Sequence, residues 1–284
     1  MNNVKIITDS AADLPQDLQD MYDISILPLH MHWEGKEYLD RVNIQPTEFY
    51  ERMAAGAPLP TTSQVTVAQF VELVRPFLEA GRQVFYTGLS GGVSATFNSA
   101  QIAKQELGNP ETFQIVDSKT SSLAACFKLL EAAKVIAEGG DAMAGVKAVE
   151  ATHSRVGTFF TVATLEYLHR GGRINTAKRI FGSALQIKPI MWMNKEDGKI
   201  DLLESVVSRK KAINRMVELM VKEAAGRKVL AIGVEHALAP DEAAEMEAKA
   251  VAAVNPASIL RADLSPMVGA HVGPGTLNLA FICE

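Results

Sequence analysis

The sequence predicts an α/β fold in two domains, with a mostly parallel, helix-covered sheet in each domain. Two observations lead to this class. Short runs rich in β-branched and aromatic residues alternate along the chain with longer segments of helical periodicity. The chain of 284 residues is also long enough for two ordinary α/β domains. We expect a boundary near Arg155, which gives domains over residues 1–155 and 156–284.

The first half begins with an apolar run and then alternates strands with helices. The expected strands are 4–8, 25–32, 83–87 and 113–116. A helix start is expected at Asp13-Leu14-Pro15-Gln16, and further helices over 46–55, 67–80, 96–107, 120–138 and 143–154. Thr66-Val67-Ala68-Gln69 fits a capping box for the helix that closes at Gly81.

The second half repeats this alternation and adds one hairpin. The expected strands are 157–162, 186–194, 199–207, 228–235, 258–264 and 276–283. The expected helices are 165–170, 176–185, 209–225 and 240–254. A turn at Glu196-Asp197-Gly198 joins two of the strands into a β-hairpin.

Composition limits the class of function. The net charge of −5 argues against nucleic acid as a partner, and 48% hydrophobic residues allow a sizeable core. Only Cys126 and Cys283 are present, so we expect no disulfide framework and a cytoplasmic protein without a signal peptide. The uncharged stretches 83–103 and 265–283 contain many Gly, Ser, Thr, Asn or Pro residues, so we expect buried or ligand-lining segments there.

Short hydroxyl-rich signatures follow several predicted strands. Thr62-Ser63-Gln64 and Ser94-Ala95-Thr96 each precede a helix, where backbone N–H groups and hydroxyls can bind an anion. Plain helix capping explains the same residues equally well. His271 is expected in a loop with Gly269, Gly273 and Gly275, where it could donate to an anion or be merely structural. Together the signatures predict a carboxylate or phosphate ligand.

Other chemistries are open at this point. His30, His32 and Glu34 alternate on one strand face, as metal ligands can, although no further ligand completes the set nearby. A hydrolase or acyl-transfer enzyme would use Ser63 or Ser94 with His271, and the hydrolase also Asp9 or Asp117, yet no Gly-x-Ser-x-Gly elbow is present. No P-loop or dinucleotide fingerprint opens a helix, so we expect neither ATP binding by this chain nor a cofactor.

Taken together, these stretches resemble the DegV family of bacterial fatty-acid-binding proteins over the whole chain. The resemblance rests on the order and spacing of several motifs. They are Thr8-Asp9-Ser10, Thr62-Ser63-Gln64, Ser94 with Thr96, Val116-Asp117-Ser118, Leu165-Glu166-Tyr167-Leu168 with Gly171-Gly172-Arg173-Ile174, Lys188-Pro189-Ile190 and Gly273-Pro274-Gly275-Thr276.

The resemblance implies a two-domain binding protein that holds one long-chain fatty acid and has no catalysis of its own. The carboxylate would lie at the domain junction, bound by Thr62, Ser63, Ser94, Thr96 and Gly273 of these motifs, with His271 closing the site. Arg173 and Arg209 are the expected head-group or partner residues. The implied partner is the ATP-binding subunit of a fatty acid kinase, which forms an acyl phosphate for phospholipid synthesis; transient contact with a membrane surface belongs to the same expectation.

Three departures from the family pattern concern this site and its partner. Val65 stands where the family usually has Pro, and Ala95 where it usually has Gly. Val207-Ser208 replaces the usual Arg-Thr, which displaces Arg209 by two positions. An apolar tunnel is also expected for the tail, because each buried methylene is worth about 0.8 kcal/mol. Its candidate walls are Ile180, Phe181, Leu185, Ile187, Ile190 and Met191.

Overall fold

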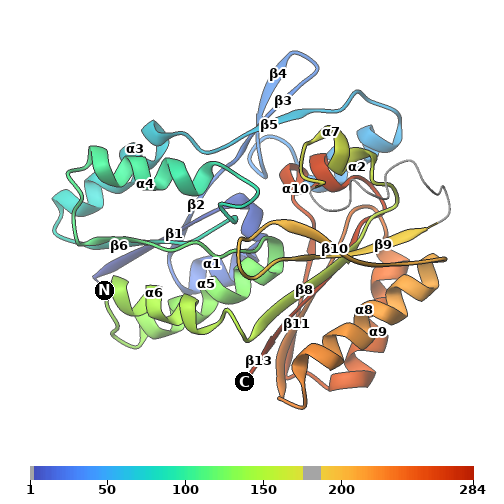
Figure 1. Cartoon of the computed structure of the whole chain (residues 1–284). Helices are drawn as coiled ribbons and strands as arrows, with labels where there is room; N and C mark the ends of the chain where they lie inside the picture. Colours follow the sequence, from blue (N-terminus) through green and yellow to red (C-terminus); the bar gives the residue numbers. More distant parts are fainter. Residues whose placement is uncertain (1–2, 175–186) are drawn as a thin grey trace.

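The computed structural model describes residues 3–174 and 187–284 (Figure 1). The first half contains a four-stranded sheet with strand order β2-β1-β6-β7, in which every neighbouring pair is parallel. Its strands are β1 (Val4–Asp9), β2 (Ile24–Leu27), β6 (Gln83–Tyr86) and β7 (Phe113–Ile115). Helices α3 (Val67–Glu79) and α4 (Thr96–Glu106) cover one face, and α5 (Ser122–Ala137) and α6 (Ala142–Ala151) cover the other. The parallel, helix-covered sheet predicted for this half is confirmed.

The second half contains a six-stranded sheet with order β10-β9-β8-β13-β11-β12. Its strands are β8 (Val156–Thr161), β9 (Lys188–Met193), β10 (Ile200–Val206), β11 (Val229–His236), β12 (Ser258–Asp263) and β13 (Leu277–Cys283). The α/β class holds, but the prediction of a mostly parallel sheet is wrong here, because only β11 and β12 run parallel. A hairpin joins β9 to β10, and β13 inserts between β8 and β11 in the opposite direction.

Helix α5 lies between the two large sheets, whereas α8 (Arg209–Ala224) and α9 (Pro240–Val254) cover the second sheet from its other face (Figure 1). Most residues of α5 are buried, including Leu123, Cys126 and Phe127. A helix that packs on both sides has no polar face, which explains its apolar sequence. Cys126 and Cys283 are both buried free thiols, as the sequence indicates.

A third, smaller sheet carries part of the candidate site. It is antiparallel, with order β4-β3-β5, and consists of β3 (His30–Trp33), β4 (Lys36–Leu39) and β5 (Thr61–Ser63). The sequence predicted neither β4 nor β5. Strand β5 has three hydroxyl residues and no apolar alternation, so only its pairing with β3 identifies it.

Short helices complete the architecture. They are the 3₁₀-helix η1 (Ser10–Ala12), α1 (Gln16–Met21), α2 (Pro46–Ala54), α7 (Glu166–Arg170) and α10 (Pro266–Val272). Helix α10 lies where the sequence indicated a loop, so His271 is helical. The helix predicted over 176–185 lies outside the described residues. Within the described part of the chain, none of the helices has the length and apolar character needed to cross a membrane.

The predicted capping box at the start of α3 is present. Gln69 N–H donates to Thr66 Oγ1 over 3.2 Å, and Thr66 N–H donates to Gln69 Oε1 over 2.9 Å. We expect Thr66→Ala to lower the free energy of unfolding by about 1 kcal/mol, because the Gln69 N–H loses its side-chain acceptor. Urea denaturation measures this loss. Thr66→Ser keeps the acceptor and should retain most of the stability; equal losses in both variants would contradict the capping role.

Candidate functional site

A cavity of about 130 Å³ lies between the two halves of the chain. It brings together five of the residues that the sequence singled out: Thr62, Ser63, Ser94, Arg173 and His271. The remaining lining residues are Leu29, Gln64, Leu89, Val93, Ala95, Ser121, Met193, Ile200, Met267, Val268 and Val272. One end of the cavity is therefore polar, and the rest is mainly aliphatic.

The polar end is formed by Thr62 on β5 and His271 in the last turn of α10. Thr62 Oγ1 lies 2.8 Å from His271 Nε2. Thr62 pairs with Met31 across β3 and β5, which fixes the backbone of this short strand. Two residues that are 209 positions apart in the sequence thus share one hydrogen bond in the wall of the cavity.

His271 is neutral at physiological pH. Burial, together with the positive charge of Arg173, lowers the pKa of its imidazole to about 4. Its Nδ1 is buried and has no hydrogen-bond partner among the described residues. We assign the proton to Nε2, because an unpartnered lone pair costs less than an unpartnered N–H. In this tautomer the ring presents an N–H donor toward Thr62 and the cavity.

Ser94 lines the cavity and is held in place by Thr96. Ser94 Oγ donates to Thr96 Oγ1 over 3.0 Å, and Thr96 N–H donates to Ser94 Oγ over 3.2 Å. Thr96 is fully buried and does not line the cavity, so it supports the site from behind. Val65 N–H also donates to Thr96 Oγ1, over 3.3 Å. A proline at position 65 would lack this donor, so the departure at Val65 adds a link between the two hydroxyl motifs.

The loop that carries Ser94 contacts the tip of the β9–β10 hairpin. Ser90 Oγ donates to the Gly198 carbonyl over 2.9 Å. A Cβ atom on Gly92 would lie 2.3 Å from the Asp197 carbonyl oxygen, so only glycine allows this approach. The second half of the chain thereby supports the Ser94 loop of the first half.

Arg173 lies between the cavity and a wider opening. Its Nε donates to the Val93 carbonyl over 3.3 Å, and Nη1 donates to the Gly171 carbonyl over 2.5 Å. The opening has a volume of about 510 Å³ and shares Thr62, Arg173 and His271 with the inner cavity. Arg170 also lines the opening, where it pairs with Glu166 over 2.7 Å, so the positive charge that acts on His271 comes from Arg173.

Gly273 and Arg209, which were also expected at the site, contact other parts of the fold instead. Gly273 ends α10 with φ +77°, and a Cβ atom there would lie 2.2 Å from the Tyr167 ring. Arg209 forms a bidentate ion pair with Glu242 and also donates to the Gly275 carbonyl. Neither residue lines the cavity, so the structure does not place Arg209 at the head group.

The described residues form neither the metal site nor the hydrolase triad that the sequence left open. Among the described residues no cluster of three or more His, Cys, Asp or Glu side chains could hold a metal; His30 Nε2 contacts the Gln69 amide, and Glu34 pairs with Arg52. A hydrolase needs a carboxylate on His271 Nδ1. Asp9 instead accepts hydrogen bonds from Tyr86 and Leu89, and Asp117 from Gly91 and Lys119.

The apolar end of the cavity leads toward a smaller one of about 40 Å³. Both are lined by Ser121, Met193, Ile200, Val268 and Val272. The predicted tunnel walls Ile180, Phe181 and Leu185 lie outside the described residues. Ile187, Ile190 and Met191 are described but line neither cavity, and the last two are fully buried in core clusters. The apolar lining comes from α10, the hairpin and Leu29, Leu89 and Val93 of the first half, which apolar patterning alone did not distinguish from ordinary core.

Comparison with known proteins identifies the family of the chain. The family model described as "Uncharacterised protein, DegV family" matches residues 3–284. The chain belongs to the DegV family. Protein DegV of Bacillus subtilis is 30% identical over 281 residues, which cover 98% of this chain and 99% of that protein.

Solved DegV-family structures have the same fold. A DegV family protein from Thermus thermophilus, described as binding fatty acid, superposes with a TM-score of 0.92 at 30% identity and covers 99% of each chain. DegV from Bacillus subtilis, described as a fatty acid binding protein, superposes with a TM-score of 0.88 at 29% identity over 100% of both chains. These matches confirm the α/β fold and the family that the sequence motifs indicated.

Proposed function

We propose that this DegV-family protein binds one long-chain fatty acid, with the carboxylate held by Thr62, Ser94 and His271. The observation that carries the proposal is the pair formed by Thr62 and the neutral His271 in the wall of the cavity, with Oγ1 and Nε2 2.8 Å apart. Ser63 and Ser94 line the same cavity. Fatty acid binding by the two related structures supports this choice of ligand.

The polar end suits a carboxylate because it offers neutral donors beside one arginine. Hydroxyl and imidazole N–H groups satisfy the carboxylate oxygens without the desolvation cost of a fully buried ion pair. The aliphatic lining then receives the start of the tail. A tail of roughly 15 carbons gains on the order of 12 kcal/mol on burial before ordering costs, at about 0.8 kcal/mol per methylene.

The finer part of the proposal concerns what happens to the bound acid. We propose that this chain is a cytoplasmic carrier without catalysis of its own, and that an ATP-dependent fatty acid kinase phosphorylates the carboxylate for phospholipid synthesis. The outer opening supports this step, since it reaches Thr62 and His271 and is lined by Arg170 and Arg173. The Arg173 guanidinium beside His271 suits an incoming phosphoryl group. The carrier needs no nucleotide fingerprint, and the sequence contains none.

Thr62→Ala and Ser94→Ala test the ligand site directly. We expect each variant to bind fatty acid about 10- to 100-fold more weakly, because a hydrogen bond to a charged group contributes about 1.5–3 kcal/mol. Native mass spectrometry of the purified protein, followed by lipid extraction, identifies any co-purified acid. Titration with that acid then gives the affinities.

Thr112→Ala is the matched control, because Thr112 is exposed and, among the residues that the structure describes, its backbone carbonyl accepts from Val84 N–H. This variant should bind as the wild type does. A wild-type protein that neither carries nor takes up a fatty acid would overturn the proposed function.

A further inference from the structure

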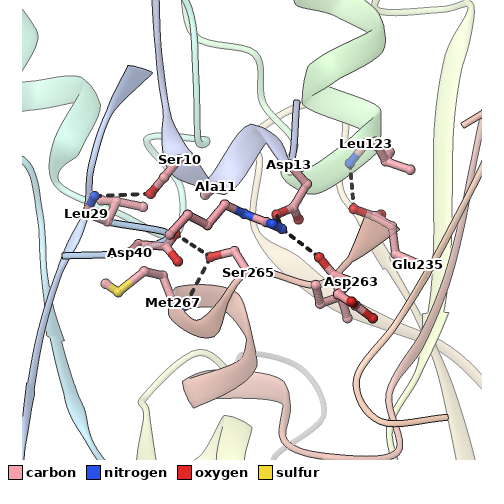
Figure 2. Close-up of polar contacts among 12 residues, drawn as sticks. Ser10, Ala11, Asp13, Leu29, Asp40, Leu123, Glu235, Asp263, Ser265 and Met267 are labelled. Carbon is pink, nitrogen blue, oxygen red and sulfur yellow. Dashed lines mark hydrogen bonds and ion pairs between the residues drawn. The ribbon is translucent and has the colours of Figure 1, made fainter. Parts of the chain in front are cut away.

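Helix α10, which carries His271, begins in a buried hydrogen-bond cluster that joins the two halves of the chain (Figure 2). Ser265 Oγ donates to Asp40 Oδ2 over 2.6 Å, and Met267 N–H donates to Ser265 Oγ over 3.0 Å. Ser265 has no exposed surface, and Asp40 is 1% exposed. The N-cap of α10 is thus fixed by a residue that directly follows β4, 225 positions earlier in the sequence.

Tyr50 of α2 supports the same helix at two further points. Its hydroxyl donates to the Leu264 carbonyl over 3.0 Å. A Cβ atom on Gly269 would lie 2.3 Å from the Tyr50 hydroxyl oxygen, so the helix backbone rests directly on this side chain. Both contacts come from the first half of the chain, as does Asp40.

Further polar contacts surround this N-cap. Arg41 Nη2 lies 2.6 Å from Asp13 Oδ1 and donates to the Asp263 carbonyl over 2.7 Å. Ser10 Oγ accepts from Leu29 N–H over 3.1 Å, and Leu29 lines the ligand cavity (Figure 2). The cluster therefore fixes a cavity wall as well as the start of α10.

Helix α10 connects its N-cap at Ser265 to the ligand site at His271. His271 follows Ser265 by six residues, which is about 9 Å along a helix at about 1.5 Å per residue. A helix this short moves as one rigid unit when its N-cap moves. Met267, Val268 and Val272 of the same helix line the cavity. The position of the N-cap thus determines where His271 Nε2 lies relative to Thr62.

We propose that Asp40 and Ser265 are positioning residues of the fatty-acid site: their hydrogen bond across the two halves of the chain places α10 so that His271 faces Thr62. This inference deepens the proposed function and rests on it, because it concerns the same head-group site. Neither residue lines the cavity, so both act through His271.

The test is a double-mutant cycle between Ser265→Ala and His271→Ala, with fatty-acid affinity as the readout. In the wild-type background we expect Ser265→Ala to weaken binding about tenfold. In the His271→Ala background the same change should have little further effect, because the group that it misplaces is already absent. Equal losses in both backgrounds, or no loss in either, would overturn the proposal.

A pair of variants at Asp40 separates positioning from helix capping. Asp40→Asn keeps an oxygen acceptor for Ser265 and should retain the affinity. Asp40→Leu has a similar shape without the acceptor, leaves the bond from Met267 N–H to Ser265 intact, and should weaken binding as Ser265→Ala does. The two Asp40 variants also test the proposal if Ser265→Ala fails to fold. Asp40→Leu binding as tightly as Asp40→Asn would contradict the role of this bond.

Ser208→Ala is the control for a general loss of stability, since Ser208 Oγ caps α8 through Lys211 N–H in the same manner, outside the cavity. It should leave affinity unchanged. A second readout needs no ligand: the ring-nitrogen NMR shifts of His271 should change in Ser265→Ala and not in Ser208→Ala. If the wild type binds no fatty acid, the proposed function fails, while these shifts still decide whether Ser265 positions His271.

Discussion

Gly92→Ala is expected to separate the Ser94 loop from the β9–β10 hairpin and to weaken both folding and ligand binding. The added Cβ would lie 2.3 Å from the Asp197 carbonyl oxygen and 2.6 Å from the carbonyl carbon and oxygen of Gly198. These are backbone atoms and cannot rotate away, so either the loop or the hairpin must move. Overpacking of this kind costs about 1–3 kcal/mol or more.

The affinity should fall together with the stability, because Ser94 follows Gly92 by two residues. Urea denaturation gives the loss of unfolding free energy, and fatty-acid titration gives the loss of affinity. We expect an affinity loss of about tenfold or more, comparable to the loss of one hydrogen bond to the carboxylate.

Gly108→Ala is the matched control for this substitution. Gly108 has φ +83°, and no atoms lie within 4 Å of the place that a Cβ atom would occupy, so alanine there has only the cost of left-handed backbone, about 1–2 kcal/mol. Its fatty-acid affinity should remain that of the wild type. If Gly92→Ala bound fatty acid as well as Gly108→Ala does, the hairpin contact would not be needed for the site.

Asp40→Asn is expected to change how stability depends on pH. Burial raises the pKa of the Asp40 carboxyl to about 7, although hydrogen bonds from Ser10 and Ser265 and the charge of Arg41 oppose this shift. Between about pH 4 and pH 7 the folded protein thus holds a proton that the unfolded chain releases. The free energy of unfolding falls as pH rises through this window, by up to ~4 kcal/mol from this group. Asparagine cannot ionise, so the variant lacks this decline.

The measurement is the difference in unfolding free energy between variant and wild type, from chemical denaturation at several pH values. The difference is needed because other groups titrate in the same range: burial lowers the pKa of His271 to about 4, which makes stability rise with pH between about pH 4 and 6.5. We expect the variant to gain on the wild type from pH 4 to pH 7 and the gap to stay constant above that. Parallel profiles for the two proteins would contradict a raised pKa at Asp40.

The polar end of the site could be predicted from the sequence because its residues belong to short motifs with a local signature. Thr62 and Ser94 each precede a helix, and His271 lies in a glycine-rich stretch. The structure brings these three together. The structural role of Arg209 could not be predicted in this way. Its partners Glu242 and Gly275 come from other segments of the chain and cannot be recognised from the sequence around Arg209. The role of Thr96 could not be predicted from local sequence either, because Thr96 supports Ser94 from a buried position.

Strand direction in the second sheet could not be predicted for a related reason. Alternating strands and helices usually indicate parallel crossovers, yet α10 leads into β13, which pairs antiparallel with both β8 and β11. Strand β5 and helix α10 were missed because both are short, and their boundaries depend on partners in other parts of the chain. Asp40 and Ser265 left no signal at all, because a buried polar pair is defined only by packing.

The position of β13 has a consequence for how the protein is made. This strand comes last among the described elements, yet it lies inside the second sheet, between β8 and β11. The strands β10-β9-β8 and β11-β12 therefore form two separate ribbons that β13 joins. Because β13 follows these five strands along the chain, the second sheet can close only after all of them have been made. Loss of β13 would separate the two ribbons, whereas loss of an edge strand such as β12 would only shorten the sheet.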